Sequence, residues 1–301
     1  MDVRNLILHG RDTIPGLARV YPQLFLMPGT PDAEERYRDI VLCGQDAPTR
    51  SLAHFAGDPK DSCLPEETPA GAVPVITLHR RADFELFLQI MANRCTPVPI
   101  PRTQGAAILD GVINWTRIWD HKEEFVRLHG PGADWEGEFA RFTADKDNFK
   151  DALIVLSVGP YSAVSAEIMD LDEREWLSVS HTIRKVHECT HFICRRFFPD
   201  KKDAVWDELV ADAAGIAAAF GRFDPAVEER FLGIKGGRYT GGRLENYLDG
   251  DGDRRERLDA LARKIHNVLP LFESIGDAFR GRSPYELAIR LEEEIGCWKH
   301  Q

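Results

Sequence analysis

The spacing of apolar and polar positions predicts a mixed first half of the chain and a mostly helical second half. In the first hundred residues, Pro and Gly interrupt short apolar runs of the length and composition that strands favour. A helix is expected at residues 82–93, where apolar side chains recur near helical spacing. The strands predicted before that helix lie at residues 5–9, 23–27, 40–43 and 73–78.

The middle of the chain combines a connector, an ambiguous segment and a strand. Residues 95–102 contain three prolines, which predicts an extended connector. Residues 104–117 fit either a helix or a pair of strands, because two glycines weaken both patterns. Two helices, a strand and a further extended stretch are then expected at residues 121–128, 135–142, 152–158 and 162–169.

Nearly every segment beyond residue 172 has helical periodicity. The expected fold class is therefore α+β, with a small sheet in a mixed N-terminal half and a helical C-terminal half. We divide the chain into residues 1–150, a mixed α/β region of unknown role, and residues 151–301, or else treat it as one continuous domain. The helices expected in the second region lie at residues 182–197, 203–220, 225–232, 254–278 and 284–295.

One of these helices carries a metal-binding pattern. His187 and His191 are four residues apart in the sequence His-Glu-Cys-Thr-His, so on a helix both imidazoles lie on one face. Glu188 lies at the edge of that face, where its carboxylate contacts a metal-bound water rather than the metal. No Pro or Gly interrupts the surrounding segment. The pattern predicts a zinc site with Glu188 as the general base.

The next predicted helix supplies two carboxylates on one face. Glu208 and Asp212 are four residues apart among small and apolar residues, which allow a close approach to a second helix. Catalytic zinc usually takes three protein ligands and leaves a fourth position for water, and Glu208 completes that number. Asp212 is expected to accept the other ring N–H of a ligating histidine. Buried carboxylates need such partners.

The two motifs together resemble those of the gluzincin metallopeptidases, the thermolysin-like group, in which His-Glu-x-x-His is followed by Glu-x-x-x-Asp. The likeness covers residues 187–212 and implies a zincin-like metallopeptidase region in the second half of the chain. By position it implies that the zinc ligands are His187, His191 and Glu208, that the base is Glu188, and that the carboxylate supporting a ligand is Asp212.

The strand predicted at residues 152–158 fits the same resemblance. In such peptidases an edge strand near the metal pairs with an extended substrate by strand addition. The alternative is a plain buried strand that leads into the helix carrying the two histidines.

The reaction expected of this site is hydrolysis of a peptide or related amide bond by zinc-activated water. Zinc lowers the pKa of its water towards about 7 and polarises the carbonyl group, while Glu188 transfers the proton to the leaving nitrogen. A further donor is needed for the developing oxyanion. The glycine-rich segment 233–242 suggests a flexible lid that contains the candidate Tyr239 and is followed directly by the candidate Arg243. The candidate donors are Tyr239, Arg243, Tyr247 and His266.

Charge and composition restrict the partners. The formal net charge of -11 argues against a general nucleic-acid binder, which needs cations to neutralise phosphates. The longest apolar stretch is too short to cross a bilayer, and no secretory signal is visible, so no membrane partner and a cytoplasmic location are expected. The cysteines are scattered and are expected to be free thiols. They are Cys43, Cys63, Cys95, Cys189, Cys194 and Cys297.

The favoured interpretation is a zinc-dependent metallopeptidase that acts on a peptide or protein substrate, either as an endopeptidase or as an aminopeptidase. The first alternative is a metal-binding regulatory or interaction protein with little or no peptidase activity. The second alternative is a protein without a metal, in which the motif arose by chance. The residues do not indicate an oligomeric state.

Overall fold

The computed structural model describes residues 2–201, 203–248 and 253–295, and these residues have the predicted α+β fold. Contacts divide the chain into two compact units. Unit 1 comprises Met1–Glu67 and Ala72–Val158, and unit 2 comprises Thr68–Gly71 and Gly159–Gln301. The predicted boundary after residue 150 lies just before this division, because the strand Lys150–Ser157 belongs to the sheet of unit 1.

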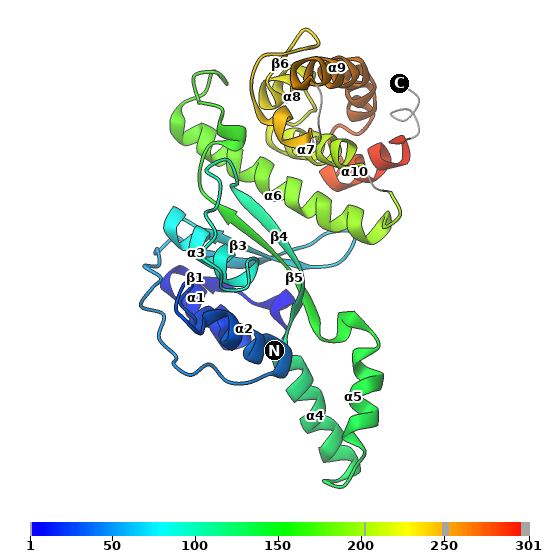
Figure 1. Ribbon diagram of the computed structural model, residues 1–301. Helices are drawn as coiled ribbons and strands as arrows, with labels where there is room; N and C mark the ends of the chain where they lie inside the picture. The colour runs from blue at the N-terminus through cyan, green and yellow to red at the C-terminus, as the bar shows by residue number, and fades with distance from the viewer. Residues whose placement is uncertain (1, 202, 249–252, 296–301) are drawn as a thin grey trace. The chain divides into compact units, whose positions relative to one another are not determined.

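The sheet of unit 1 has the strand order β1-β2-β3-β5-β4 (Figure 1). The buried strand β3, Val73–Leu78, is parallel to β5, Lys150–Ser157. On the other side of β5, β4, Ala106–Ile113, runs antiparallel and forms an edge of the sheet. The far side consists of β2, Ser62–Glu66, and β1, Leu8–His9. Because β5 is paired on both sides, it is a buried interior strand. Of the two interpretations of this segment, the plain buried strand is confirmed and the edge strand is wrong.

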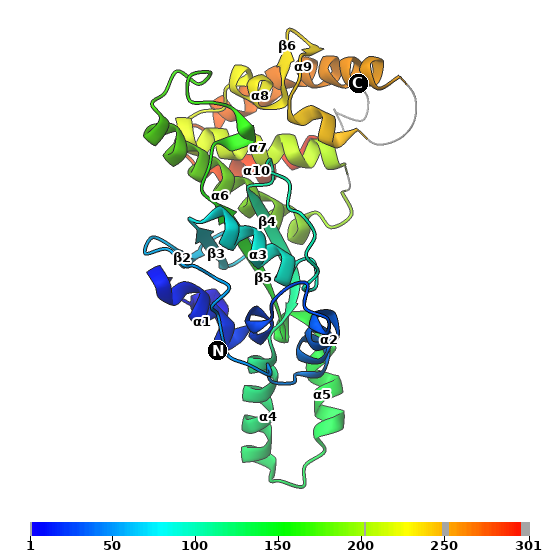
Figure 2. The same cartoon turned by 60° about the vertical axis from the view of Figure 1, so that its left-hand side comes forward.

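Helices in unit 1 complete its hydrophobic core. α3, Arg81–Met91, buries Phe84 and Phe87 and contacts both β3 and β5. α4 and α5 lie side by side as a helical hairpin (Figure 2). The remaining helical segments are η1 Val3–Asn5, η2 Gly10–Asp12, α1 Thr13–Val20, η3 Pro22–Phe25, α2 Ala33–Cys43, α4 Trp115–His129, α5 Trp135–Thr143 and η4 Lys146–Asn148.

Several predictions for unit 1 are wrong, and each has a local cause. The strand predicted at 23–27 is the 3-10 helix η3, which begins at a proline suited to a first helical turn. The strand predicted at 40–43 is the last turn of α2, where Ile40 is buried but Leu42 is 63% exposed. The apolar run therefore spans both faces of a helix. Residues 104–117 contain a single strand, β4, whose register shifts between Leu109 and Val112.

The elements of unit 1 that were not predicted include α1 and β2. The helix α1 contains both Pro15 and Gly16, which are poor helix formers. A Cβ atom at Gly16 would lie 2.6 Å from the end of the Leu8 side chain, which would then have to move. The strand β2 contains Pro65, which weakens the strand pattern in the sequence.

Unit 2 is built on two long helices that pack against each other, α6, Glu173–Phe197, and α7, Ala204–Phe220. α6 begins nine residues before its predicted start at residue 182, because Asp172 caps it. Residues 162–169, predicted to be extended, contain turns and the end of η5 instead. The other elements are η5 Tyr161–Ala163, α8 Pro225–Leu232, β6 Ile234–Lys235, β7 Arg238–Tyr239, η6 Arg243–Tyr247, α9 Arg254–Ala278 and α10 Pro284–Glu293.

Two further expectations concern cysteines and membrane spans. Cys43, Cys63, Cys95, Cys189 and Cys194 are free thiols as predicted, and Cys297 lies outside the described residues. In the described part of the chain, no helix combines the length and the apolar character that a membrane span requires.

Candidate metal centre

The candidate ligands lie on two helices of unit 2 that approach each other closely. His187 and His191 are on α6 and Glu208 is on α7. The close approach depends on Gly215, where a Cβ atom would lie 2.8 Å from the carbonyl oxygen of Ile183 on α6. The prediction that small residues on α7 permit this contact is therefore confirmed. α7 also buries Ala211 and Ala214 completely.

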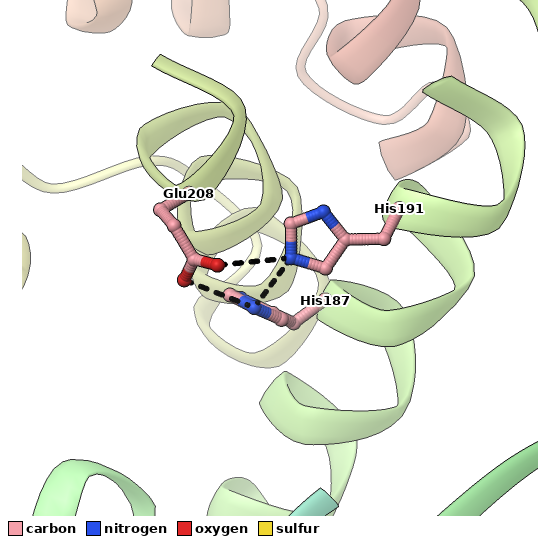
Figure 3. Close-up of side chains that lie close together, drawn as sticks. All are labelled: His187, His191 and Glu208. Carbon is pink, nitrogen blue, oxygen red and sulfur yellow. Dashed lines mark hydrogen bonds and ion pairs between the residues drawn. The ribbon is translucent and has the colours of Figure 1, made fainter. Parts of the chain in front are cut away.

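The three side chains converge on one point, as Figure 3 shows. The Nε2 atoms of His187 and His191 are 3.0 Å apart. The Glu208 carboxylate places one oxygen 3.5 Å from Nε2 of His187 and the other 3.4 Å from Nε2 of His191. Zinc bonds of about 2.0–2.1 Å at tetrahedral angles separate neighbouring ligand atoms by roughly 3.3 Å. The spacing of the three donors therefore fits a single zinc ion.

Asp212 determines which ring nitrogen of His187 faces this point. Its Oδ1 atom lies 2.8 Å from Nδ1 of His187, and its carboxylate is fully buried. An ionised carboxylate only accepts hydrogen bonds, so Nδ1 carries the proton and Nε2 presents a lone pair. That lone pair points toward His191 and the negative Glu208. A cation between the three side chains satisfies all of them at once, which supports a metal at this position.

Tyr161 is part of the site, although the sequence did not indicate it. Its hydroxyl group donates to Oδ1 of Asp212 at 2.5 Å and lies 2.9 Å from Nδ1 of His187. At the other end of the residue, the Tyr161 backbone N–H donates to the buried Ser180 hydroxyl at 3.0 Å. Ser180 and His187 are seven residues apart, about two turns along the same face of α6. Tyr161 therefore lies along that face.

Two of the four oxyanion candidates contact the site. Arg243 donates to the Tyr161 hydroxyl at 3.0 Å and also to Oδ2 of Asp212. The Tyr247 hydroxyl donates to Oε2 of Glu208 at 2.9 Å. Both residues belong to η6, which follows the glycine-rich segment.

The other two candidates have different partners. The Tyr239 hydroxyl donates to the carbonyl oxygen of Gly242 at 3.0 Å, within its own loop. The glycine-rich segment forms the β6–β7 hairpin, in which Tyr239 is buried, rather than an irregular lid. His266 is exposed and its Nδ1 atom lies 2.6 Å from Glu229. Neither side chain has a contact with the three candidate ligands in the described part of the chain.

The charges around the site favour an ionised Glu208 and a neutral His187. Burial opposes ionisation of Glu208, but the hydrogen bond from His191 and the positive charge of Arg243 favour its ionised form, and its pKa is well below the usual value. Burial lowers the pKa of His187. These are the protonation states that metal ligands require.

Two further glutamates border the centre in different ways. Glu188 is half-buried beside His187, and its carboxylate has no hydrogen-bond partner among the described residues. Glu228 on α8 is fully buried, and burial followed by the charge of Glu208 raises its pKa well above the usual value. Glu228 was not predicted from the sequence, because a single glutamate on a helix gives no signal.

The class that the fold and the site define is an α+β protein with a His-His-Glu cluster of metal-binding geometry. A family model described as a family of unknown function (DUF7005) matches residues 28–283, and the chain belongs to this family. The matched residues include the whole candidate metal centre. No curated protein and no solved structure matches the chain.

Proposed function

We propose that the chain is a zinc-dependent hydrolase, most plainly a metallopeptidase that cleaves a peptide or protein substrate. The observation that carries the proposal is the convergence of His187, His191 and Glu208, with the His187 tautomer determined by Asp212. Two imidazoles and one carboxylate are a ligand set of catalytic zinc, which leaves a position open. A structural zinc site would instead use four protein ligands.

The residues around the cluster have roles in this proposal. Zinc, when bound, supplies a Lewis acid and lowers the pKa of water. Glu188 accepts the proton of the attacking water and delivers it to the leaving nitrogen. Tyr247 and Arg243 hold hydrogen-bond donors beside the cluster. Tyr247 is the better candidate for a substrate oxygen, because its hydroxyl lies against the candidate ligand Glu208, whereas the bonded nitrogens of Arg243 face Asp212 and Tyr161.

The first test is the metal content of the purified chain, measured by elemental mass spectrometry after reconstitution with zinc. We expect about one zinc per wild-type chain and none in His191→Ala. His266→Ala is the matched control, because it removes an exposed histidine that pairs with Glu229. Absence of zinc from the wild-type chain would contradict the proposal and favour a protein without a metal.

The second test separates an enzyme from a protein that only binds metal. Glu188→Gln removes the base but none of the three ligands, so it is expected to keep zinc and to lose turnover of a fluorogenic peptide library by about 10²-fold or more. Full turnover in Glu188→Gln would rule out this mechanism. Zinc binding without turnover in the wild-type chain would favour a metal-binding regulatory or interaction protein. The cytoplasmic location remains part of the proposal.

A further inference from the structure

A recess of about 660 Å³ lies within unit 1 and shares no residue with the metal centre. Its volume is within the range of ligand-binding pockets. The wall consists of α2, Gln23 of η3, the end of α3 with the segment that follows it, and β4. Residues 108–113 of β4 all line it. Because side chains of a strand alternate between the two faces of the sheet, six consecutive lining residues place the recess along the edge of the strand.

The edge of β4 has backbone groups that are open to a partner. β4 pairs with β5 on one side and is the last strand of the sheet on the other, within the described residues. The register shift beside Gly111, which has a φ of 75°, bends the strand next to the recess. An unpaired strand edge is a template for an extended peptide, whose main chain can continue the sheet.

One uncharged polar side chain stands in the wall of the recess. Gln23 lines it and is only 3% exposed. A buried amide needs hydrogen-bond partners, because leaving one unpaired is costly. Its position in the wall of the recess makes the amide available to a ligand. An amide both donates and accepts, which is the pattern that matches a peptide group.

The charged groups of the recess indicate what the ligand carries. Arg38 and Arg94 line it, and neither guanidinium group has a carboxylate partner in the described part of the chain. Glu34 already accepts a hydrogen bond from the Thr96 hydroxyl, at 3.1 Å. Asp110 is exposed at the bend of β4. The two arginines are therefore the groups left to bind a carboxylate of the ligand.

Arg94 is held at the recess by an unusual backbone. Arg94 and Cys95 both adopt left-handed conformations, with φ of 54° and 62°, just after α3 ends. The Cys95 side chain is fully buried and anchors this turn. Left-handed conformations are uncommon for residues other than glycine, and they persist where the surrounding structure enforces them.

We propose that this recess binds an extended peptide segment with an acidic side chain, which adds to the edge of β4. Arg38 and Arg94 bind the acidic side chain, and Gln23 binds a peptide group of the same segment. The site is separate from the proposed zinc chemistry, and its ligand is a binding partner rather than a cleaved bond. The inference therefore does not depend on the presence of zinc.

The test uses a phage-displayed library of random peptides on the full-length Glu188→Gln chain, so that turnover does not interfere. We expect the selected peptides to contain Asp or Glu. The double variant R38E/R94E is expected to select Lys or Arg instead. Arg19→Glu is the matched control, since Arg19 is exposed in unit 1 outside the recess and should leave the selection unchanged.

Affinities of a selected, labelled peptide complete the test. R38E/R94E is expected to weaken binding by about tenfold or more, and Gln23→Leu by roughly tenfold. If the Gln23 amide serves the ligand, Gln23→Leu should leave the urea midpoint of the free chain unchanged, whereas a purely structural role would lower that midpoint. N-methylation of the peptide should weaken binding at every second position.

Three results would overturn the proposal. The first is a library from which no peptide is enriched. The second is a set of selected peptides that bind R38E/R94E and the parent chain with equal affinity. The third is a dimer of the free chain that dissociates in R38E/R94E. The last result would place a second copy on the edge of β4. Peptide binding at the recess does not require zinc binding or catalysis at the metal centre, so either proposal can fail without the other.

Discussion

The Nδ1 atom of His187 and the Oδ1 atom of Asp212 lie 2.8 Å apart, and this contact joins α6 to α7. The same carboxylate accepts hydrogen bonds from Tyr161 and Arg243, so three separate segments depend on it. Because Asp212 orients the His187 ring, the ligand geometry depends on a residue that does not itself reach the metal position.

Asp212→Asn is expected to weaken zinc binding by about 10–100-fold, because the amide no longer holds His187 in one tautomer and leaves the Arg243 charge unpaired. Competition with a chromophoric zinc chelator would measure the change. Glu229→Gln serves as the control, since it neutralises a carboxylate that pairs with the exposed His266. Equal zinc affinities for Asp212→Asn and the wild-type chain would show that Asp212 does not support the ligand.

Tyr247→Phe and Tyr239→Phe test which tyrosine belongs to the site. The Tyr247 hydroxyl contacts Glu208, whereas the Tyr239 hydroxyl contacts Gly242 within its own loop. Tyr247→Phe should reduce kcat for a peptide substrate by about tenfold or more if its hydroxyl stabilises the reacting oxygen. Tyr239→Phe should leave kcat unchanged while lowering the unfolding free energy by about 1 kcal/mol. A lower kcat in Tyr239→Phe together with an unchanged kcat in Tyr247→Phe would assign Tyr239, and not Tyr247, to the site.

The local part of the site was predictable from the sequence, because it depends on helical spacing alone. His187 and His191, and likewise Glu208 and Asp212, each lie four residues apart within one helix. The pairing of the two helices was also inferable, since small residues such as Gly215 mark a close contact. These inferences need only the geometry of a helix and the number of ligands that zinc requires.

The nonlocal part was not predictable by the same reasoning. Tyr161 lies in a short 3-10 segment, 26 residues before His187, and its hydroxyl contacts the His187 ring. Its backbone N–H donates to Ser180, and no periodic pattern in the sequence indicates either contact. Likewise, whether β5 lies at the edge or in the centre of the sheet depends on pairing with β3 and β4. Apolar composition shows that such a strand is buried but not which strands are its neighbours.

Gly215→Ala tests whether the close helix contact determines the metal geometry. The added methyl group would lie 2.8 Å from a backbone oxygen of Ile183, so α7 must move away from α6. We expect a loss of about 1–3 kcal/mol in unfolding free energy and weaker zinc binding, because Glu208 moves with α7. Gly132→Ala is the control, as no atom lies within 4 Å of its added methyl group. A Gly215→Ala chain of wild-type stability would show that the contact tolerates the methyl group.

Glu292 on α10 gives a prediction about pH. It is fully buried, and burial together with the charge of Asp207 raises its pKa from 4.5 to about 7. Between these two values the unfolded chain has lost the proton that the folded chain keeps. This group therefore stabilises the fold least above pH 7, and its contribution falls as the pH rises from 4.5 to about 7.

Glu292→Gln removes this titration, since an amide stays neutral at every pH. At neutral pH the variant is expected to be more stable than the wild-type chain by about 3 kcal/mol. This difference in unfolding free energy should vanish as the pH falls to the pKa of the unfolded chain. Urea unfolding at a series of pH values would measure it. Glu293→Gln, at the exposed neighbouring position, is the control and should not change the pH profile. If the gap between Glu292→Gln and the wild-type chain were the same at every pH, Glu292 would not titrate differently in the folded state.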